Sequence, residues 1–175
     1  MHLLWLATAI LMVGLVFLLW QWPKSTAHSF SQHAATNAAS IWYYFGLFVV
    51  TESLLATWFW REIAGSLHFG QIIAICFTVS ALLQIACTLV PEIGELRIKI
   101  HRVFAGASGL LLLPIEWLLF ISSTPSDTIQ PLLITALVIQ LTILIYLAIR
   151  QQVMAWPLQT AYYLAFLVPL FFLRI

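Results

Sequence analysis

The chain has 175 residues, of which 63% are hydrophobic and only 7% are charged. Soluble domains carry about 25% charged residues because their surfaces must hold water, so seven Lys/Arg and six Asp/Glu cannot cover a water-facing surface of this size. The formal net charge of +1 excludes a basic field that would attract nucleic acid, and no P-loop or dinucleotide-binding fingerprint is present. We therefore predict an all-α, polytopic transmembrane protein whose single integral-membrane domain covers residues 1–175.

Six apolar runs are long enough to cross a bilayer, which requires about 20 mostly apolar residues. Prolines fall at most of the run edges, where a missing N–H costs little. Tryptophans gather within a few residues of the run ends, as in an interfacial belt: Trp5, Trp20, Trp22, Trp42, Trp58, Trp60 and Trp156. The pattern predicts a six-helix bundle with spans over about residues 3–20, 41–60, 69–90, 100–121, 131–149 and 157–173.

The first run, residues 3–20, could be mistaken for a signal peptide. It lacks a positively charged beginning and is longer than a usual apolar signal segment, so we expect a membrane span. Residues 23–40 (PKSTAHSFSQHAATNAAS) follow as the longest loop, which is polar but almost uncharged. We expect this loop to carry a short interfacial helix.

Two carboxyl groups lie within the apolar runs, at similar depths in the same half of the membrane. Glu52 belongs to the second run (VVTESLL) and Glu116 to the fourth (LLPIEWL). Placing such a group in the hydrocarbon costs at least about 2.5 kcal/mol, so both are expected to face the bundle interior. Each serves either as a protonated or hydrogen-bonded packing contact, or in binding a ligand, proton or ion.

Small and polar residues of the third and fourth runs share single helix faces. A helical wheel at about 100° per residue groups, on the fourth run, His101, Ala105, Ser108, Leu112 and Glu116. The corresponding face of the third run contains Phe77, Ser80, Ala81, Gln84, Cys87 and Thr88. Small residues let a neighbouring helix approach closely, so both faces should contact protein. A binding pocket or buried polar interior is therefore hypothesised at Glu52, Ser80, Gln84, Ser108 and Glu116.

A second polar cluster lies between the third and fourth runs, in PEIGELRIKIHR: Glu92, Glu95, Arg97, Lys99, His101 and Arg102. It is interpreted as an ordinary polar interface with Glu–Arg/Lys pairs, or as a contact with lipid head groups through the basic residues. His28 and His33 are on the same side, but no HxxxH, HExxH or CxxC spacing fixes a metal site. We therefore predict no metal and no cofactor. No residue is assigned a catalytic role, since no GxSxG elbow is present.

Positive residues divide unevenly between the two faces. One face receives Lys24, Arg97, Lys99, Arg102 and Arg150, whereas the face of both termini receives Arg61 and Arg174. The positive-inside rule predicts that the first of these faces lies in the cytoplasm and that both termini of this multi-pass protein lie outside.

The stretch LVPEIGELRIKIHRVFAGASGLLLLPIEWLLF combines a Pro-acidic loop with a His that opens a fourth span containing small residues and a central Pro. It resembles the prokaryotic six-span family known as domain of unknown function nine-nine-eight, and distantly the Frag/DRAM/Sfk group of eukaryotic six-span proteins. Pro91, Glu92 and His101 occupy the family-like positions, although Glu92 replaces the usual Asp and the first-loop motif, here SFSQHAATNAAS, is degraded. The resemblance covers about 30 residues and the six-span plan. It implies no activity, and it places this loop outside, opposite to the charge count.

Three functions are consistent with these features. We expect a non-enzymatic protein that binds a lipid or small hydrophobic ligand within the helix bundle. One alternative is an accessory subunit or assembly factor of a larger membrane complex, which would imply a membrane-protein partner or a second copy of the chain. Another is a lipid-modifying enzyme with Glu52, Glu116 or His101 as acid or base, which would require one of them to border an open cavity beside a second polar group.

Overall fold

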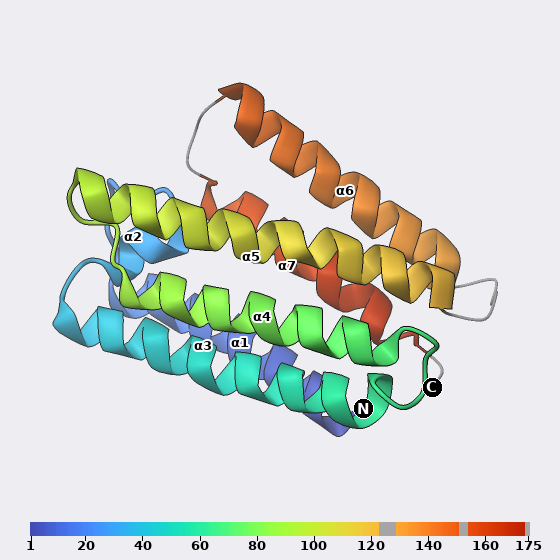
Figure 1. Cartoon of the computed structure of the whole chain (residues 1–175). Coiled ribbons are helices and arrows are strands. Elements are labelled where there is room, and N and C mark those ends of the chain that lie inside the picture. The colour runs from blue at the N-terminus through green and yellow to red at the C-terminus, as the bar shows by residue number, and fades with distance from the viewer. Residues whose placement is uncertain (123–128, 151–153, 174–175) are drawn as a thin grey trace.

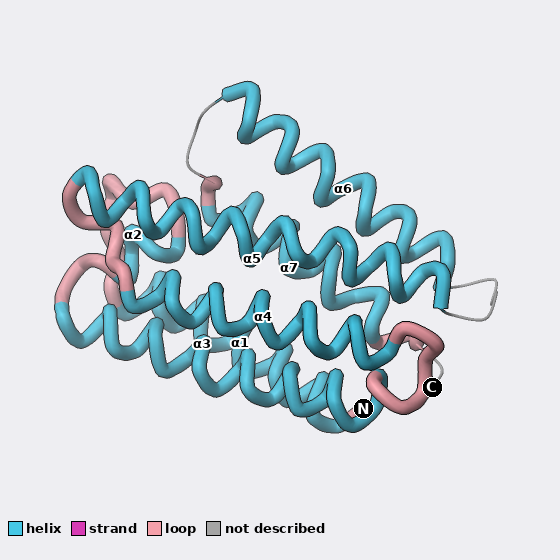
Figure 2. The backbone as a smooth tube through the Cα atoms, in the orientation of Figure 1, coloured by secondary structure: helices cyan, strands magenta, loops and turns pink. Residues whose placement is uncertain are grey.

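The computed structural model describes residues 1–122, 129–150 and 154–173, and within these ranges the chain forms only helices and loops (Figures 1 and 2). Its elements in chain order are α1 (His2–Gln21), α2 (Phe30–Ala34), α3 (Ala38–Trp58), the π-helical turn η1 (Phe59–Ile63), α4 (Gly70–Leu89), α5 (Glu95–Ser122), α6 (Ile129–Arg150) and α7 (Trp156–Leu170).

The long helices run alternately between two ends of an elongated bundle. One end, here called the α2 end, holds α2 and the turn before α5, and the other, the terminal end, holds both chain termini (Figure 1). Five helices are long and apolar enough to cross a membrane: α1, α3 with η1, α4, α5 and α6. The all-helical architecture is thereby confirmed for the described residues, and the five apolar helices are compatible with a multi-pass membrane protein. The sixth predicted run forms α7, whose 15 residues make it shorter than any of these five helices.

Helix ends differ from the predicted runs where polar residues extend a helix beyond the apolar segment. α5 begins at Glu95, earlier than the predicted residue 100, and Lys99 Nζ lies 2.7 Å from Glu95 Oε1 across one turn. Gly94 precedes it with φ 78°, a left-handed conformation that glycine adopts without strain. At the other extreme, α7 ends at Leu170, directly after Pro169.

The two predicted protein-facing stripes are confirmed by burial. Ser80, Gln84 and Cys87 of α4 are buried, as are Ser108 and Glu116 of α5. α4 and α5 pack along their whole length, side by side in Figure 1. The hydrophobic periodicity of both runs therefore correctly identified the helix faces that pack against other helices.

Aromatic rings link η1, α4 and α7 in the middle of the bundle. Phe59 stacks on Phe77 with ring centroids 4.2 Å apart, and Phe166 lies 6.3 Å from Phe59 and 6.0 Å from Phe77. All three side chains are buried. This contact draws the short helix α7 into the core, although α7 is the last element of the chain.

Exposed tryptophans form two belts, one near each end of the bundle. Their members are Trp20, Trp42 and Trp156 at the α2 end and Trp5, Trp60 and Trp117 at the terminal end. Such belts are typical of the two membrane–water interfaces. The prediction for Trp58 was wrong: this side chain is fully buried, because it lies on the opposite side of the helix from Trp60.

The loop between α1 and α3 contains the predicted short helix, α2, which is largely buried. Its N-cap Ser29 accepts a hydrogen bond from Gln32 N at 3.2 Å. The Phe30 N–H donates to Gln159 Oε1 at 3.1 Å, and Trp156 N donates to His28 O at 2.7 Å. These bonds attach the beginning of α7 to the first loop.

Candidate functional site

A cavity of about 280 Å³ lies towards the α2 end and is lined by residues of α2, α3, α4, α5, α6 and α7. The polar part of its wall comprises Ser31, Tyr44, Gln84, Glu92, His101, Arg102, Ser108, Gln159, Tyr162 and Tyr163. Its larger apolar side chains are Leu112, Leu144, Leu147 and Met154. The volume is close to the lower limit of about 300 Å³ for small-molecule sites, so it fits a head group or a small ligand better than an entire lipid.

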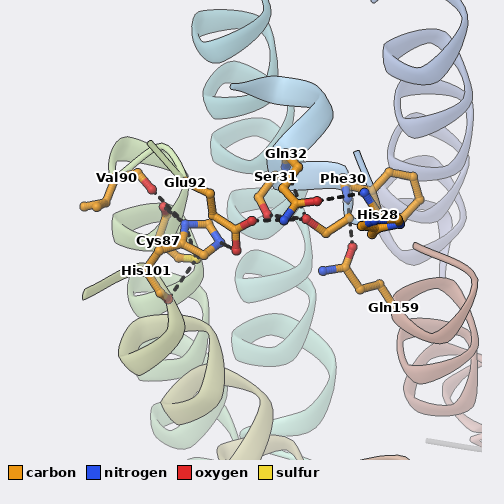
Figure 3. Close-up of polar contacts among 10 residues, drawn as sticks. His28, Phe30, Ser31, Gln32, Cys87, Val90, Glu92, His101 and Gln159 are labelled. Carbon is orange, nitrogen blue, oxygen red and sulfur yellow. Dashed lines mark hydrogen bonds and ion pairs between the residues drawn. The ribbon is translucent and has the colours of Figure 1, made fainter. Parts of the chain in front are cut away.

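Glu92 and His101 meet at the polar side of this cavity (Figure 3). His101 Nδ1 lies 2.7 Å from Val90 O and 3.0 Å from Cys87 O, so it must carry the proton, because a carbonyl only accepts. His101 Nε2 is 3.6 Å from Glu92 Oε1. The exposed fractions of the side chains are only 7% for His101 and 5% for Glu92.

Two serines of the first loop extend this polar contact. Ser29 Oγ donates to Glu92 Oε2 at 3.3 Å, and it lies 3.0 Å from Ser31 Oγ. Ser31 itself lines the cavity. Ser31, Ser29, Glu92 and His101 thus form a continuous series of polar contacts. This series depends on α2 packing against the turn that precedes α5.

Several polar side chains of the cavity make no hydrogen bond with any described residue. Gln84 is 7% exposed and Tyr44 is 6% exposed, yet the Gln84 amide and the Tyr44 hydroxyl remain unbonded within the described part of the chain. Neither group is among the described polar atoms that are completely buried without a partner, so both can be reached from the cavity. These groups are therefore positioned to bind a molecule that occupies the cavity.

The cavity opens between α5 and α6. Arg102 and Gly106 of α5 line it and are exposed, while Leu144 and Leu147 of α6 form part of the same wall. Leu144 and Leu147 are apolar residues of a helix apolar enough to span the membrane. The wall of the cavity on this side is therefore apolar next to the exposed residues of α5.

The five residues predicted from the helix faces occupy different places. Gln84 and Ser108 line the cavity, and Ser80 Oγ donates to Ser108 O at 3.0 Å behind its wall. Glu52 and Glu116 are buried but are not among the lining residues. The structure therefore brings together three of these residues and leaves the two carboxyls elsewhere in the core.

Neither embedded carboxyl forms a hydrogen bond with a residue that the structure describes. Glu116 is fully buried, and both of its oxygens lack a partner in this part of the chain. Tyr162 and Tyr163 of α7 line the cavity, whereas Glu52 and Glu116 do not.

The predicted loop cluster divides in a similar way. Glu92, His101 and Arg102 belong to the cavity wall. Glu95 pairs with Lys99 on the surface, and Arg97 is also exposed. Across the described ranges, no group of three or more His, Cys, Asp or Glu side chains is arranged to hold a metal ion.

Sequence analysis missed five polar residues of the cavity wall: Ser31, Tyr44, Gln159, Tyr162 and Tyr163. Two tyrosine pairs within apolar runs, at 43–44 and 162–163, were a signal that could have been used. A phenol in a membrane span needs a polar partner or an interface, and residues 162–163 lie several residues inside their run.

Comparisons with known proteins add no relative. No protein-family model matches the sequence, and neither the curated proteins nor the solved structures give a match. Over the described residues, the fold and site define the chain as an all-helical protein with five candidate membrane spans and a largely apolar cavity that carries several polar groups. The resemblance to the six-span family of unknown function stays a prediction.

Proposed function

We propose that this chain binds one lipid or lipid-like amphiphile, with the polar head group in the cavity and the apolar tail between α5 and α6. The observation that carries this proposal is the unbonded Gln84 amide, buried in a cavity whose other side is apolar and opens beside α6. A head group supplies the missing hydrogen bonds. The tail stays in an apolar medium, so it is not transferred into water.

The proposal includes a sixth membrane crossing by α7, with both termini outside. α7 is about 22 Å long at about 1.5 Å per residue, and the apolar residues Phe171 to Leu173 extend it. The location of both termini at one end of the bundle supports an even number of crossings (Figure 1). The excess of basic residues at the α2 end supports a cytoplasmic position for the cavity.

A lipid-modifying enzyme is a second candidate, favoured by one observation. His101 lines the cavity together with Glu92, so a group able to accept or donate a proton lies beside the space for a ligand. Conversion of an added lipid by the purified protein, absent in His101→Gln, would support this candidate in place of simple binding.

Cavity filling provides the test of binding. Leu147→Trp places a large ring in the cavity, whereas Ile145→Trp places the same ring on the exposed side of α6 as a matched control. Each protein is purified in mild detergent, and retained lipid is measured by native mass spectrometry. We expect lipid at about one molecule per chain in the original protein and in Ile145→Trp, and a loss of at least tenfold in Leu147→Trp. Equal retention by both variants, or no retained lipid in the original protein, would overturn the proposal.

A further inference from the structure

We infer that the amphiphile is an anionic phospholipid whose phosphate binds Arg102 and whose uncharged, hydroxyl-bearing head group reaches Gln84 and Tyr44. This inference rests on the proposed function and adds the chemical class of the ligand. It starts from a cation at the mouth of the cavity. Arg102 lines the cavity and makes no ion pair with any described residue, whereas Lys99, one turn away, pairs with Glu95.

The depth of Arg102 matches the level of lipid phosphates. Arg102 precedes Trp117 of the terminal-end belt by 15 residues, the same separation as between Trp5 and Trp20 on α1. Along an α-helix this separation is about 22 Å. Arg102 therefore lies at about the level of the α2-end belt, where Trp20 is exposed. Interfacial tryptophans lie at the level of the head groups, so the guanidinium can bind a phosphodiester there.

Beyond Arg102 the cavity is suited to a head group without charge. The Glu92 carboxyl already faces His101 at 3.6 Å and accepts from the Ser29 hydroxyl at 3.3 Å. Among the other polar groups of the wall, Gln84 and Tyr44 offer neutral donors and acceptors. Hydroxyl groups can both donate to and accept from them. A choline head group has no N–H or O–H, and an ethanolamine ammonium would face the Arg102 guanidinium.

The phosphate that binds Arg102 could belong to a phospholipid or to a soluble phosphate ester without acyl chains. The apolar wall of the cavity distinguishes these two ligands. Leu144 and Leu147 border the mouth beside Arg102. A soluble glycerol phosphate would leave this surface uncovered, whereas a phospholipid covers it with its chains. We therefore assign the site to the phospholipid.

The test compares four probes on the delipidated full chain in detergent: phosphatidylglycerol, phosphatidylcholine and diacylglycerol with identical acyl chains, and glycerol 3-phosphate. Binding is measured by native mass spectrometry for the original protein, Arg102→Gln and Gln84→Leu. Arg97→Gln is the control, because Arg97 is exposed and is not a lining residue.

We expect phosphatidylglycerol to bind at least tenfold more tightly than phosphatidylcholine and glycerol 3-phosphate. Arg102→Gln should weaken phosphatidylglycerol about tenfold and leave diacylglycerol unchanged. Gln84→Leu should remove the preference for glycerol over choline, and Arg97→Gln should have no effect. Equal binding of the two phospholipids, or an equal effect of Arg97→Gln and Arg102→Gln, would overturn the inference while leaving lipid binding intact. Tight binding of glycerol 3-phosphate would assign the site to a soluble ester. Failure of all acylated probes to bind would instead refute the proposed function itself.

Discussion

Glu92 is the residue on which the polar side of the cavity depends, because it contacts two different elements. One carboxyl oxygen faces His101 of α5 and the other accepts from Ser29, the N-cap of α2. The side chain is almost completely buried, so water cannot replace either contact. Removing the charge therefore affects α2 and α5 together.

Glu92→Gln should destabilise the protein by about 2 kcal/mol, in the range found for hydrogen bonds to charged groups, because His101 then loses its charged partner. Glu95→Gln is a matched control, since its pair with Lys99 is solvent-exposed and such pairs contribute at most about 1 kcal/mol. Thermal unfolding of both variants in the same detergent measures the difference. Equal midpoints for the two variants would show that the Glu92–His101 contact is not structural.

Glu116 presents the opposite case, a buried carboxyl without a hydrogen bond. Glu116→Met should raise the free energy of unfolding by about 1–3 kcal/mol, because an unsatisfied buried group is replaced by an apolar side chain of similar length. Gln140→Met is the comparison, since Gln140 Nε2 donates to Tyr162 O at 3.3 Å and the substitution removes that bond. In chemical unfolding, the free energy of unfolding of Glu116→Met should be higher than that of the original protein, and that of Gln140→Met should be lower. A destabilised Glu116→Met would reveal a structural role for the carboxyl.

At the scale of helices, the connection from η1 to α4 depends on one close approach. A Cβ atom on Gly70 would collide with the backbone carbonyl of Ile63, which cannot move as a side chain can. At Gly46, by contrast, no neighbouring atom lies within 4 Å of the Cβ position. The start of α4 therefore tolerates only glycine without rearrangement.

Gly70→Ala should lower stability by about 1–3 kcal/mol, as overpacking does, and Gly46→Ala should be neutral or raise it by up to about 1 kcal/mol, because alanine favours the helix. Unfolding midpoints of the two variants in one detergent provide the comparison. Similar midpoints would indicate that the turn between η1 and α4 rearranges without loss of stability.

Helix faces were predictable from this sequence, whereas helix ends were less so. The stripe through Ser80 and Gln84 is a property of one helix, since its spacing alone sets which side chains share a face. The early start of α5 at Glu95 depends instead on a polar turn that continues into the head-group region. A hydropathy pattern does not predict such a turn, because its residues are polar. The burial of Trp58, against its expected place in a belt, likewise depends on helix rotation relative to neighbours.

At the scale of the whole molecule, the cavity was only partly predictable. Gln84 and Ser108 were identified because they belong to buried stripes. Tyr44 and Gln159 were not, because a cavity is the space left by several helices and no single run determines it. Glu52 and Glu116 were correctly expected to be buried, but the cavity lies elsewhere, beside Glu92 and His101.

The two orientations of the bundle make opposite predictions for labelling from outside the cell. With the α2 end in the cytoplasm, an impermeant maleimide should label Ser66→Cys in intact cells and Ser25→Cys only after permeabilisation. Both serines are exposed, and they lie in the loops at opposite ends of the bundle. The original chain controls for Cys76 and Cys87. The reverse pattern would contradict the charge count and agree with the family resemblance. A reporter fused after residue 175 should share the side of Ser66 if α7 crosses the membrane.

The attachment of α7 to the first loop has a consequence for biogenesis. Phe30 and Gln159, whose hydrogen bond closes this part of the cavity, are 129 residues apart in the chain. At a translation rate of about 5–20 residues per second, their synthesis is separated by roughly ten seconds. During that interval α2 and the polar groups beneath it lack their last covering helix, although most of the bundle has been made. The cavity is therefore completed only at the end of synthesis, and under the proposed function we expect lipid to bind after the last helix has been made.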